Sequence, residues 1–133
     1  MKRRSEGGTG AQVGLHRAAA EGFTADVSRL IAEGADVDAR DSTLRTPLHA
    51  ACQQEQLEVV KILLAAGALV DPRDSFGNTP LWRAVFAFQG GDPTLIRLLL
   101  DAGADPDCKN DSNRSPRDMA LTFERPGIRT VFP

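Results

Sequence analysis

The chain of 133 residues is poor in the residues that usually carry enzyme chemistry or span membranes. It has two histidines, two cysteines, one tryptophan and no tyrosine, and its formal net charge is only −2. So small a charge attracts neither nucleic acid nor an anionic membrane. Apolar clusters such as residues 62–70 are far too short to cross a bilayer, and no apolar segment of a secretory signal follows the polar start. We therefore expect a cytoplasmic protein that binds neither nucleic acid nor membranes.

Motifs for catalysis and metal binding are missing as well. The sequence has no Gly-rich phosphate loop before a helix, no GxSxG and no HExxH. Cys52 and Cys108 lie far apart without metal-ligand spacing, so we expect free thiols, with Cys52 packed on a stripe of small residues. A calcium loop needs closely alternating ligands, a spacing not matched by Asp36, Asp38, Asp71, Asp105 and Asp107, which fit solvated turns. The sequence predicts no enzyme, no metal and no cofactor.

What the sequence does contain is an internal repeat. The segment GADVDARD at 34–41 recurs as GALVDPRD at 67–74 and as GADPDCKN at 103–110. A second marker keeps the same register, with TPLH at 46–49, TPLW at 79–82 and SP at 115–116. Both markers are offset by 33 and then by 36 residues, so one unit carries three extra residues. Two markers in one register predict a stack of similar units.

Each unit has the local signals of a helix pair. Thr46 can cap a helix that begins at Pro47, where a missing N–H costs nothing. The first helix then carries small and apolar residues at Leu48, Ala51 and Cys52, and a second helix carries an apolar face over residues 57–64. A glycine at the end of the second helix, Gly67, favours a left-handed turn. A hairpin-like finger over residues 70–78 leads to the next unit.

These features resemble the ankyrin repeat, whose period is 33 residues and whose signature is T-P-L-H-x-A. The resemblance implies an all-α solenoid of about three full helix-turn-helix repeats, with β-turn fingers and a truncated C-terminal cap. It divides the chain into a disordered tail at 1–12 and a domain at 13–133, with repeats at about 13–45, 46–78 and 79–114 and a capping unit at 115–133. In such repeats, His16 and His49 would order neighbouring loops through hydrogen bonds.

Some positions depart from the pattern. The turn between helices has Gly22 in the first unit and Glu55 in the second, and it is enlarged to residues 89–93 in the third. The finger glycine is replaced by Leu44 in the first finger and by Asn113 in the last. In the fourth unit, Pro126 is expected to begin a shortened second helix.

In ankyrin stacks, partners usually bind the concave side, which is made by the finger tips and the first helices. The resemblance therefore places the partner-binding residues at Arg40, Thr43, Arg45, Gln53, Arg73, Phe76, Asn78, Trp82, Arg83, Phe86, Lys109 and Arg114, with Phe123 facing the same groove. The basic residues among them are either solvated charges or a patch that matches an acidic surface on a protein partner.

Aromatic residues are concentrated in the third unit. Phe76, Trp82, Phe86 and Phe88 fall within thirteen residues, and the whole chain has seven aromatics. Trp82 stands where a histidine is usual. Trp82 and Phe86 either pack against the long loop at 89–93 or serve as exposed anchors of a binding site.

The segments PLWRAVF at 80–86 and SPRDMA at 115–120 look like those of small stand-alone bacterial ankyrin proteins. Many of these resemble immunity proteins that neutralise a toxin encoded beside them. The excess of thirteen arginines over three lysines also suits a GC-rich, bacterial genome. The resemblance implies an inhibitor that blocks a protein partner, as a monomer in a 1:1 complex. The alternative is a regulatory or scaffolding adaptor that bridges protein partners.

Overall fold

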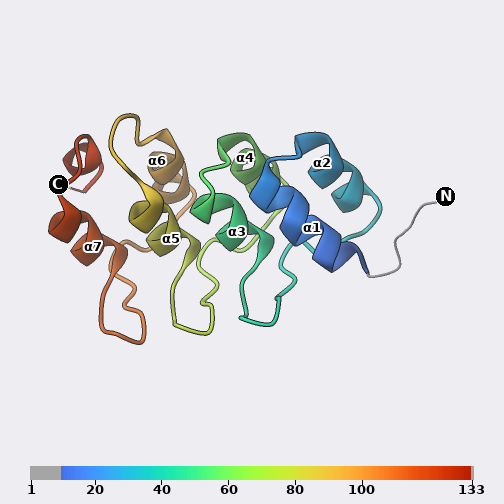
Figure 1. The fold of residues 1–133 in the computed structure, drawn as a ribbon, viewed down its shortest axis with the longest axis horizontal. Coiled ribbons are helices and arrows are strands. Elements are labelled where there is room, and N and C mark those ends of the chain that lie inside the picture. The colour runs from blue at the N-terminus through green and yellow to red at the C-terminus, as the bar shows by residue number, and fades with distance from the viewer. Residues whose placement is uncertain (1–9, 133) are drawn as a thin grey trace.

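The computed structural model describes residues 10–132, and all regular structure in that range is helical. One row of helices holds α1 (Gly10–Glu21), α3 (Pro47–Gln53), α5 (Pro80–Ala87) and α7 (Pro116–Phe123). The second row holds α2 (Thr24–Ala32), α4 (Leu57–Ala65), α6 (Thr94–Asp101) and the 3₁₀ helix η1 (Ile128–Thr130). Each loop that returns from the second row to the first projects to one side as a finger (Figure 1). The predicted helical solenoid is confirmed.

The predicted helix starts are confirmed at the three repeated Thr-Pro or Ser-Pro sites. The side chains of Thr46, Thr79 and Ser115 each accept a hydrogen bond from the backbone N–H three residues later, and a proline follows each cap. Such a cap satisfies one of the N–H groups that a helix start leaves without a partner. The repeated marker therefore fixes where α3, α5 and α7 begin.

The core runs along the stack through residues that share a repeat position. Leu15, Leu48 and Leu81 follow one another at the repeat spacing, and none of them is exposed. The predicted stripe of α3 is confirmed, since Ala51 and Cys52 are also fully buried. Burying one leucine contributes about 1.5–3 kcal/mol. Because each first helix packs between its neighbours, the core is continuous rather than divided among units.

The left-handed turns occur where the sequence places them, even where glycine is replaced. The finger position has a φ of 64° at Leu44, 79° at Gly77 and 63° at Asn113. Only Gly77 also lacks room for a side chain, because an added Cβ would lie 2.6 Å from the Asp111 carboxylate of the next finger. Leu44 adopts this conformation at a cost of about 1–2 kcal/mol.

The enlarged turn of the third unit packs against the end of the chain. Helix α5 ends at Ala87, and Gly90 and Gly91 both have positive φ. The backbone N–H of Gly91 donates to the Pro126 carbonyl at 3.1 Å. The shortened second helix of the last unit is a 3₁₀ turn, and it begins at Ile128 rather than at Pro126 because Gly127 has a φ of 91°.

The start of the domain differs from the expectation. Helix α1 begins at Gly10, so residues 10–12, which were expected in the tail, belong to the helix. The remainder of the predicted tail, residues 1–9, lies outside the described residues. The rise in helix propensity at Ala11 is the one local signal for this earlier start.

Candidate functional site

The three fingers share one turn construction. The side-chain oxygens of Asp41, Asp74 and Asn110 each accept two backbone N–H groups of their own finger, at 2.9–3.0 Å. Each of these residues also donates its own N–H to the carbonyl four residues later, at 2.9–3.0 Å. The predicted hairpin-like fingers are thereby closed by the chain itself. Their tips therefore hold a defined shape without help from a ligand.

The two histidines each bond to a neighbouring loop, as predicted, and so tie a first helix to the end of the finger in the same repeat. A ring nitrogen of His16 lies 2.8 Å from the Arg45 carbonyl, and Nε2 of His49 lies 2.8 Å from the Asn78 carbonyl. Nδ1 of His49 accepts from the Thr46 N–H at 3.1 Å. Burial lowers the pKa of His49 to about 4, although the Asn78 carbonyl opposes this. His49 is therefore neutral near pH 7 and donates through Nε2 to the next finger.

Most of the basic finger residues contact other parts of the chain. Arg40 donates to the Arg73 carbonyl at 2.6 Å, and Arg73 donates to the Lys109 carbonyl at 2.9 Å. Arg45 donates to the side chain of Gln53 at 2.7 Å, and Lys109 pairs with Asp118 at 3.1 Å. These side chains hold adjacent fingers and helices in place. They do not form one continuous free basic patch.

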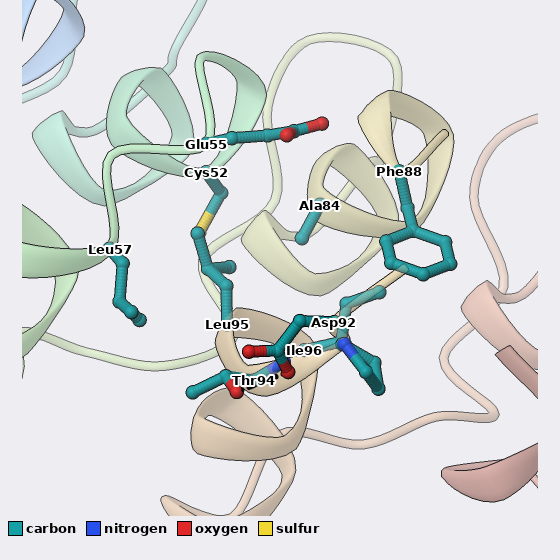
Figure 2. Close-up of a pocket in the computed structure, with 10 residues that line it drawn as sticks. Cys52, Glu55, Leu57, Ala84, Phe88, Asp92, Thr94, Leu95 and Ile96 are labelled. Atoms are coloured by element: carbon teal, nitrogen blue, oxygen red, sulfur yellow. Dashed lines mark hydrogen bonds between the residues drawn. The ribbon is translucent and has the colours of Figure 1, made fainter. Parts of the chain in front are cut away.

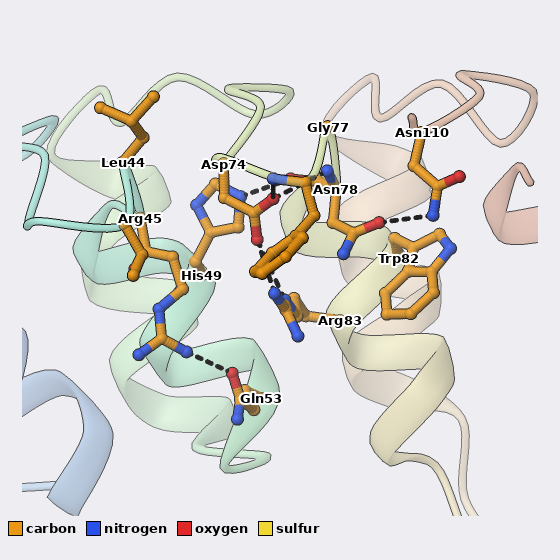
Figure 3. Close-up of polar contacts among 12 residues, drawn as sticks. Leu44, Arg45, His49, Gln53, Asp74, Gly77, Asn78, Trp82, Arg83 and Asn110 are labelled. Atoms are coloured by element: carbon orange, nitrogen blue, oxygen red, sulfur yellow. Dashed lines mark hydrogen bonds and ion pairs between the residues drawn. The ribbon is translucent and has the colours of Figure 1, made fainter. Parts of the chain in front are cut away.

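Arg83 makes the most buried ion pair of the site. Its guanidinium lies 2.7 Å from Oδ2 of Asp74, whose side chain is not exposed at all (Figure 3). Burial alone would raise the pKa of Asp74, but the hydrogen bonds from Arg83 and from two backbone N–H groups more than offset it and leave the pKa lowered. The same guanidinium lies 5.6 Å from the centre of the Trp82 ring. The pair fixes the finger to α5, and the charge of Arg83 is neutralised within the chain.

A groove of about 610 Å³ lies between the second and third fingers and the helices α5 and α7. Three aromatic rings of these helices form a continuous contact in it. Trp82 and Phe86 are stacked with centres 5.2 Å apart, and Phe86 meets the edge of Phe123 at 5.9 Å. Phe86 is 49% exposed, and Phe76 at the finger tip is 61% exposed. We call this hollow the aromatic groove.

The alternative packing of the aromatics against the long loop applies to a different residue. Phe88, which is buried, lies beside the loop and lines a pocket with Asp92 and Pro93. Phe86 instead contacts Phe123 of α7, and Trp82 stacks on Phe86. Nε1 of Trp82 is buried and has no hydrogen-bond partner in the part of the chain that the structure describes. Trp82 therefore does not replace the tie that His49 makes.

The pocket beside the long loop contains the thiol of Cys52 and has a volume of about 150 Å³ (Figure 2). Its other walls include Ala84, Phe88 and Ile96. Burial raises the pKa of the Cys52 thiol, which disfavours the thiolate that a nucleophile needs. No histidine stands among the residues that line it. The pocket offers a packing site, not a catalytic cysteine.

Between residues 10 and 132, no three histidine, cysteine, aspartate or glutamate residues are grouped so that they could hold a metal ion. In the same range, no helix combines the length and the apolar character that crossing a bilayer requires.

Six of the twelve predicted binding residues line the aromatic groove, namely Phe76, Asn78, Trp82, Arg83, Phe86 and Arg114. The other six, Arg40, Thr43, Arg45, Gln53, Arg73 and Lys109, lie outside it and make the contacts within and between fingers. Sequence reasoning missed Met119 and Thr122, which line the groove from α7. Both lie 36 residues after predicted positions, Arg83 and Phe86, so the repeat register contained the signal.

A family model described as ankyrin repeats in three copies matches residues 15–111. No curated protein matches the chain.

Proposed function

The chain belongs to the ankyrin-repeat family, since the match at residues 15–111 covers most of its length, and from that premise we propose that it binds a partner protein in the aromatic groove. Ankyrin repeats indicate a protein–protein interaction module. The observation that carries the proposal is the exposure of Phe76 and Phe86 in one concave site. Large apolar side chains exposed together mark interaction sites, and aromatic residues often dominate binding energy. The chain has no catalytic role in this proposal.

We further propose that binding inhibits the partner, as in immunity proteins. The two segments that carry this resemblance, 80–86 and 115–120, form α5 and the start of α7, which both line the groove. The partner would be a toxin encoded by an adjacent gene in a bacterium, bound in the cytoplasm as a 1:1 complex. Occupation of the groove by a loop of the toxin would keep that loop from its substrate.

The alternative is an adaptor, which needs a second binding surface. Phe23 and Leu69 favour it, because they are 50% and 58% exposed and do not line the groove. An adaptor would hold two proteins at once. Substitution of Phe23 or Leu69 would then release one of them and leave the other bound.

The experiment co-expresses the chain with the product of the adjacent gene and measures co-purification, affinity and toxin activity. Phe86→Ala and Phe88→Ala form a matched pair, because the two residues have the same side chain, but Phe86 at the end of α5 is half exposed and Phe88, the residue that follows the helix, is buried. Phe86→Ala should weaken binding by at least about 2 kcal/mol and leave melting nearly unchanged. Phe88→Ala should cost about 3–5 kcal/mol of folding.

The outcomes separate the proposals. Loss of both binding and inhibition with Phe86→Ala supports an inhibitor that acts through the groove. Binding without any effect on the partner's activity, together with a second partner, supports the adaptor. If Phe86→Ala binds as tightly as the unsubstituted chain, the aromatic groove is not the site.

A further inference from the structure

We propose that the aromatic groove selects a protein segment in which a large apolar side chain stands next to carboxylates. The proposal rests on the proposed function and adds the chemistry of the partner. Two properties of the groove carry it, namely the exposed aromatic floor and a single arginine without a counter-charge.

The charges that line the groove are neutralised within the chain, except one. Arg83 is paired with Asp74 at 2.7 Å, and Asp111 lies 3.7 Å from Arg73. Arg114 is exposed, and within residues 10–132 its side chain has neither an ion pair nor a hydrogen bond. The groove therefore presents one net positive charge at its edge, which attracts an acidic group on a partner.

The repeat register explains why Arg114 has no counter-charge. Its counterpart in the first finger is Arg45, which lies 69 residues earlier. The Arg45 guanidinium donates to Gln53 at 2.7 Å and lies 3.7 Å from Asp41. At the same register, the last unit has Thr122 in place of Gln53 and Asn110 in place of Asp41. Threonine is too short to reach, and asparagine carries no charge, so both contacts are lost.

The apolar part of the site lies directly beside this charge. Arg114 and the aromatic residues Phe76, Trp82, Phe86 and Phe123 line the same groove. An aromatic or aliphatic side chain can cover the exposed face of Phe86, which removes apolar surface of both partners from water. An adjacent carboxylate can then form the bidentate pair that guanidinium geometry favours.

The same rings could attract a cation, and the arrangement disfavours it. A cation bound over aromatic faces gains from their negative charge density. Here Arg83 already lies over Trp82, and Trp82 and Phe86 cover each other at an interplanar angle of 11°. A basic segment would also meet Arg114. The groove therefore suits an acidic partner and repels a basic one.

The experiment is a selection from a displayed library of random twelve-residue peptides against the purified chain. Enriched peptides are then synthesised, and their affinities are measured by fluorescence anisotropy at low and high salt. Arg114→Glu removes the free charge. Arg97→Glu is the matched control, because Arg97 is exposed on α6, does not line the groove and changes the net charge equally.

The enriched peptides should carry Asp or Glu next to a large apolar residue. Their affinity should fall about tenfold or more with Arg114→Glu, fall at high salt, and change little with Arg97→Glu. Melting of both variants should match the unsubstituted chain. Peptides that bind through Phe86 but are neutral or basic, or that ignore Arg114→Glu, overturn this inference and leave the proposed function standing. A selection that yields no peptide sensitive to Phe86→Ala counts against both.

Discussion

Replacing Arg83 with methionine should destabilise the fold, although Arg83 was predicted from the sequence as a binding residue. The Asp74 side chain is not exposed, and both contacts to its Oδ2 come from the Arg83 guanidinium, at 2.7 and 3.2 Å. Breaking a buried pair by removing one partner costs about 3–5 kcal/mol. Since Oδ1 keeps its two backbone N–H donors, we expect about 3 kcal/mol, near the lower limit of that range.

Urea unfolding followed by far-ultraviolet circular dichroism measures the loss. The control is Lys61→Met, because Lys61 and Glu58 form a pair at 3.3 Å with both side chains at least half exposed. That variant should lose less than about 1 kcal/mol. The double variant Asp74→Asn with Arg83→Met copies the neutral residues Asn110 and Met119 of the next unit and should recover most of the stability.

The pH dependence provides a second readout. Because the pKa of Asp74 is lowered in the folded chain, its contribution to the free energy of unfolding is complete above the ordinary aspartate pKa of 3.8. This contribution is lost as the pH falls through the folded-state pKa. Without Arg83, the effect of burial on Asp74 is less opposed and the pKa of Asp74 rises. The difference in unfolding free energy between the unsubstituted chain and Arg83→Met should therefore shrink as the solution is acidified. A loss at pH 7 no larger than that of Lys61→Met, or one that is constant from pH 7 to 3, would refute the reasoning.

Three other predictions concern single residues. The folded-state pKa of His49 is about 4, so unfolding takes up a proton below the ordinary pKa of 6.5. The free energy of unfolding should therefore fall by about 3 kcal/mol between pH 6.5 and 4. Urea titrations should show this slope, and the His49→Gln variant should lack it. In a Cys108→Ser variant, iodoacetamide should modify the buried Cys52 only as fast as the chain opens. In a Cys52→Ser variant, the remaining Cys108 should react faster. Equal rates in the two variants would contradict the burial of Cys52. Leu44→Gly should raise the free energy of unfolding by about 0.5–1 kcal/mol, because relief of the left-handed strain exceeds the entropic cost of glycine. Asn113→Gly should gain less. Thermal unfolding compares the two variants, and a less stable Leu44→Gly variant would contradict the strain.

The features of the fold that depend on local rules could be predicted from the sequence. Thr46, Thr79 and Ser115 identify their helix starts because a cap and a following proline act within a few residues. The ties from His16 and His49 followed from their shared repeat position. The start of α1 could not be predicted, because it lacks both markers, and the expected helix start at Pro126 did not allow for the left-handed turn at Gly127 that precedes η1.

The candidate site was predicted in its composition more than in its arrangement. The resemblance to ankyrin repeats implied the concave side, and the sequence placed Trp82 and Phe86 on one helix without deciding whether they are packed or exposed. The contacts of the basic residues could not be predicted from the sequence, because whether a long side chain reaches the next finger depends on how closely the fingers approach each other. Arg40 and Arg73 donate to the carbonyls of the next finger, whereas Arg114 has no partner within residues 10–132 because Asn110 and Thr122 stand at the repeat positions of Asp41 and Gln53.

The ties between fingers also determine how the molecule should respond to tension. The arginine ties join the finger of each unit to that of its immediate neighbour, so a force applied at the two ends passes through them in series. Units should detach one at a time, and each detached unit of 33 residues adds about 110 Å of extended chain. Trp82 lacks the imidazole tie that His16 and His49 make to the fingers of their own repeats, and the last unit has a short 3₁₀ turn as its second helix, so we expect this end of the stack to yield first. Pulling would thus open the aromatic groove before it disturbs the rest of the stack.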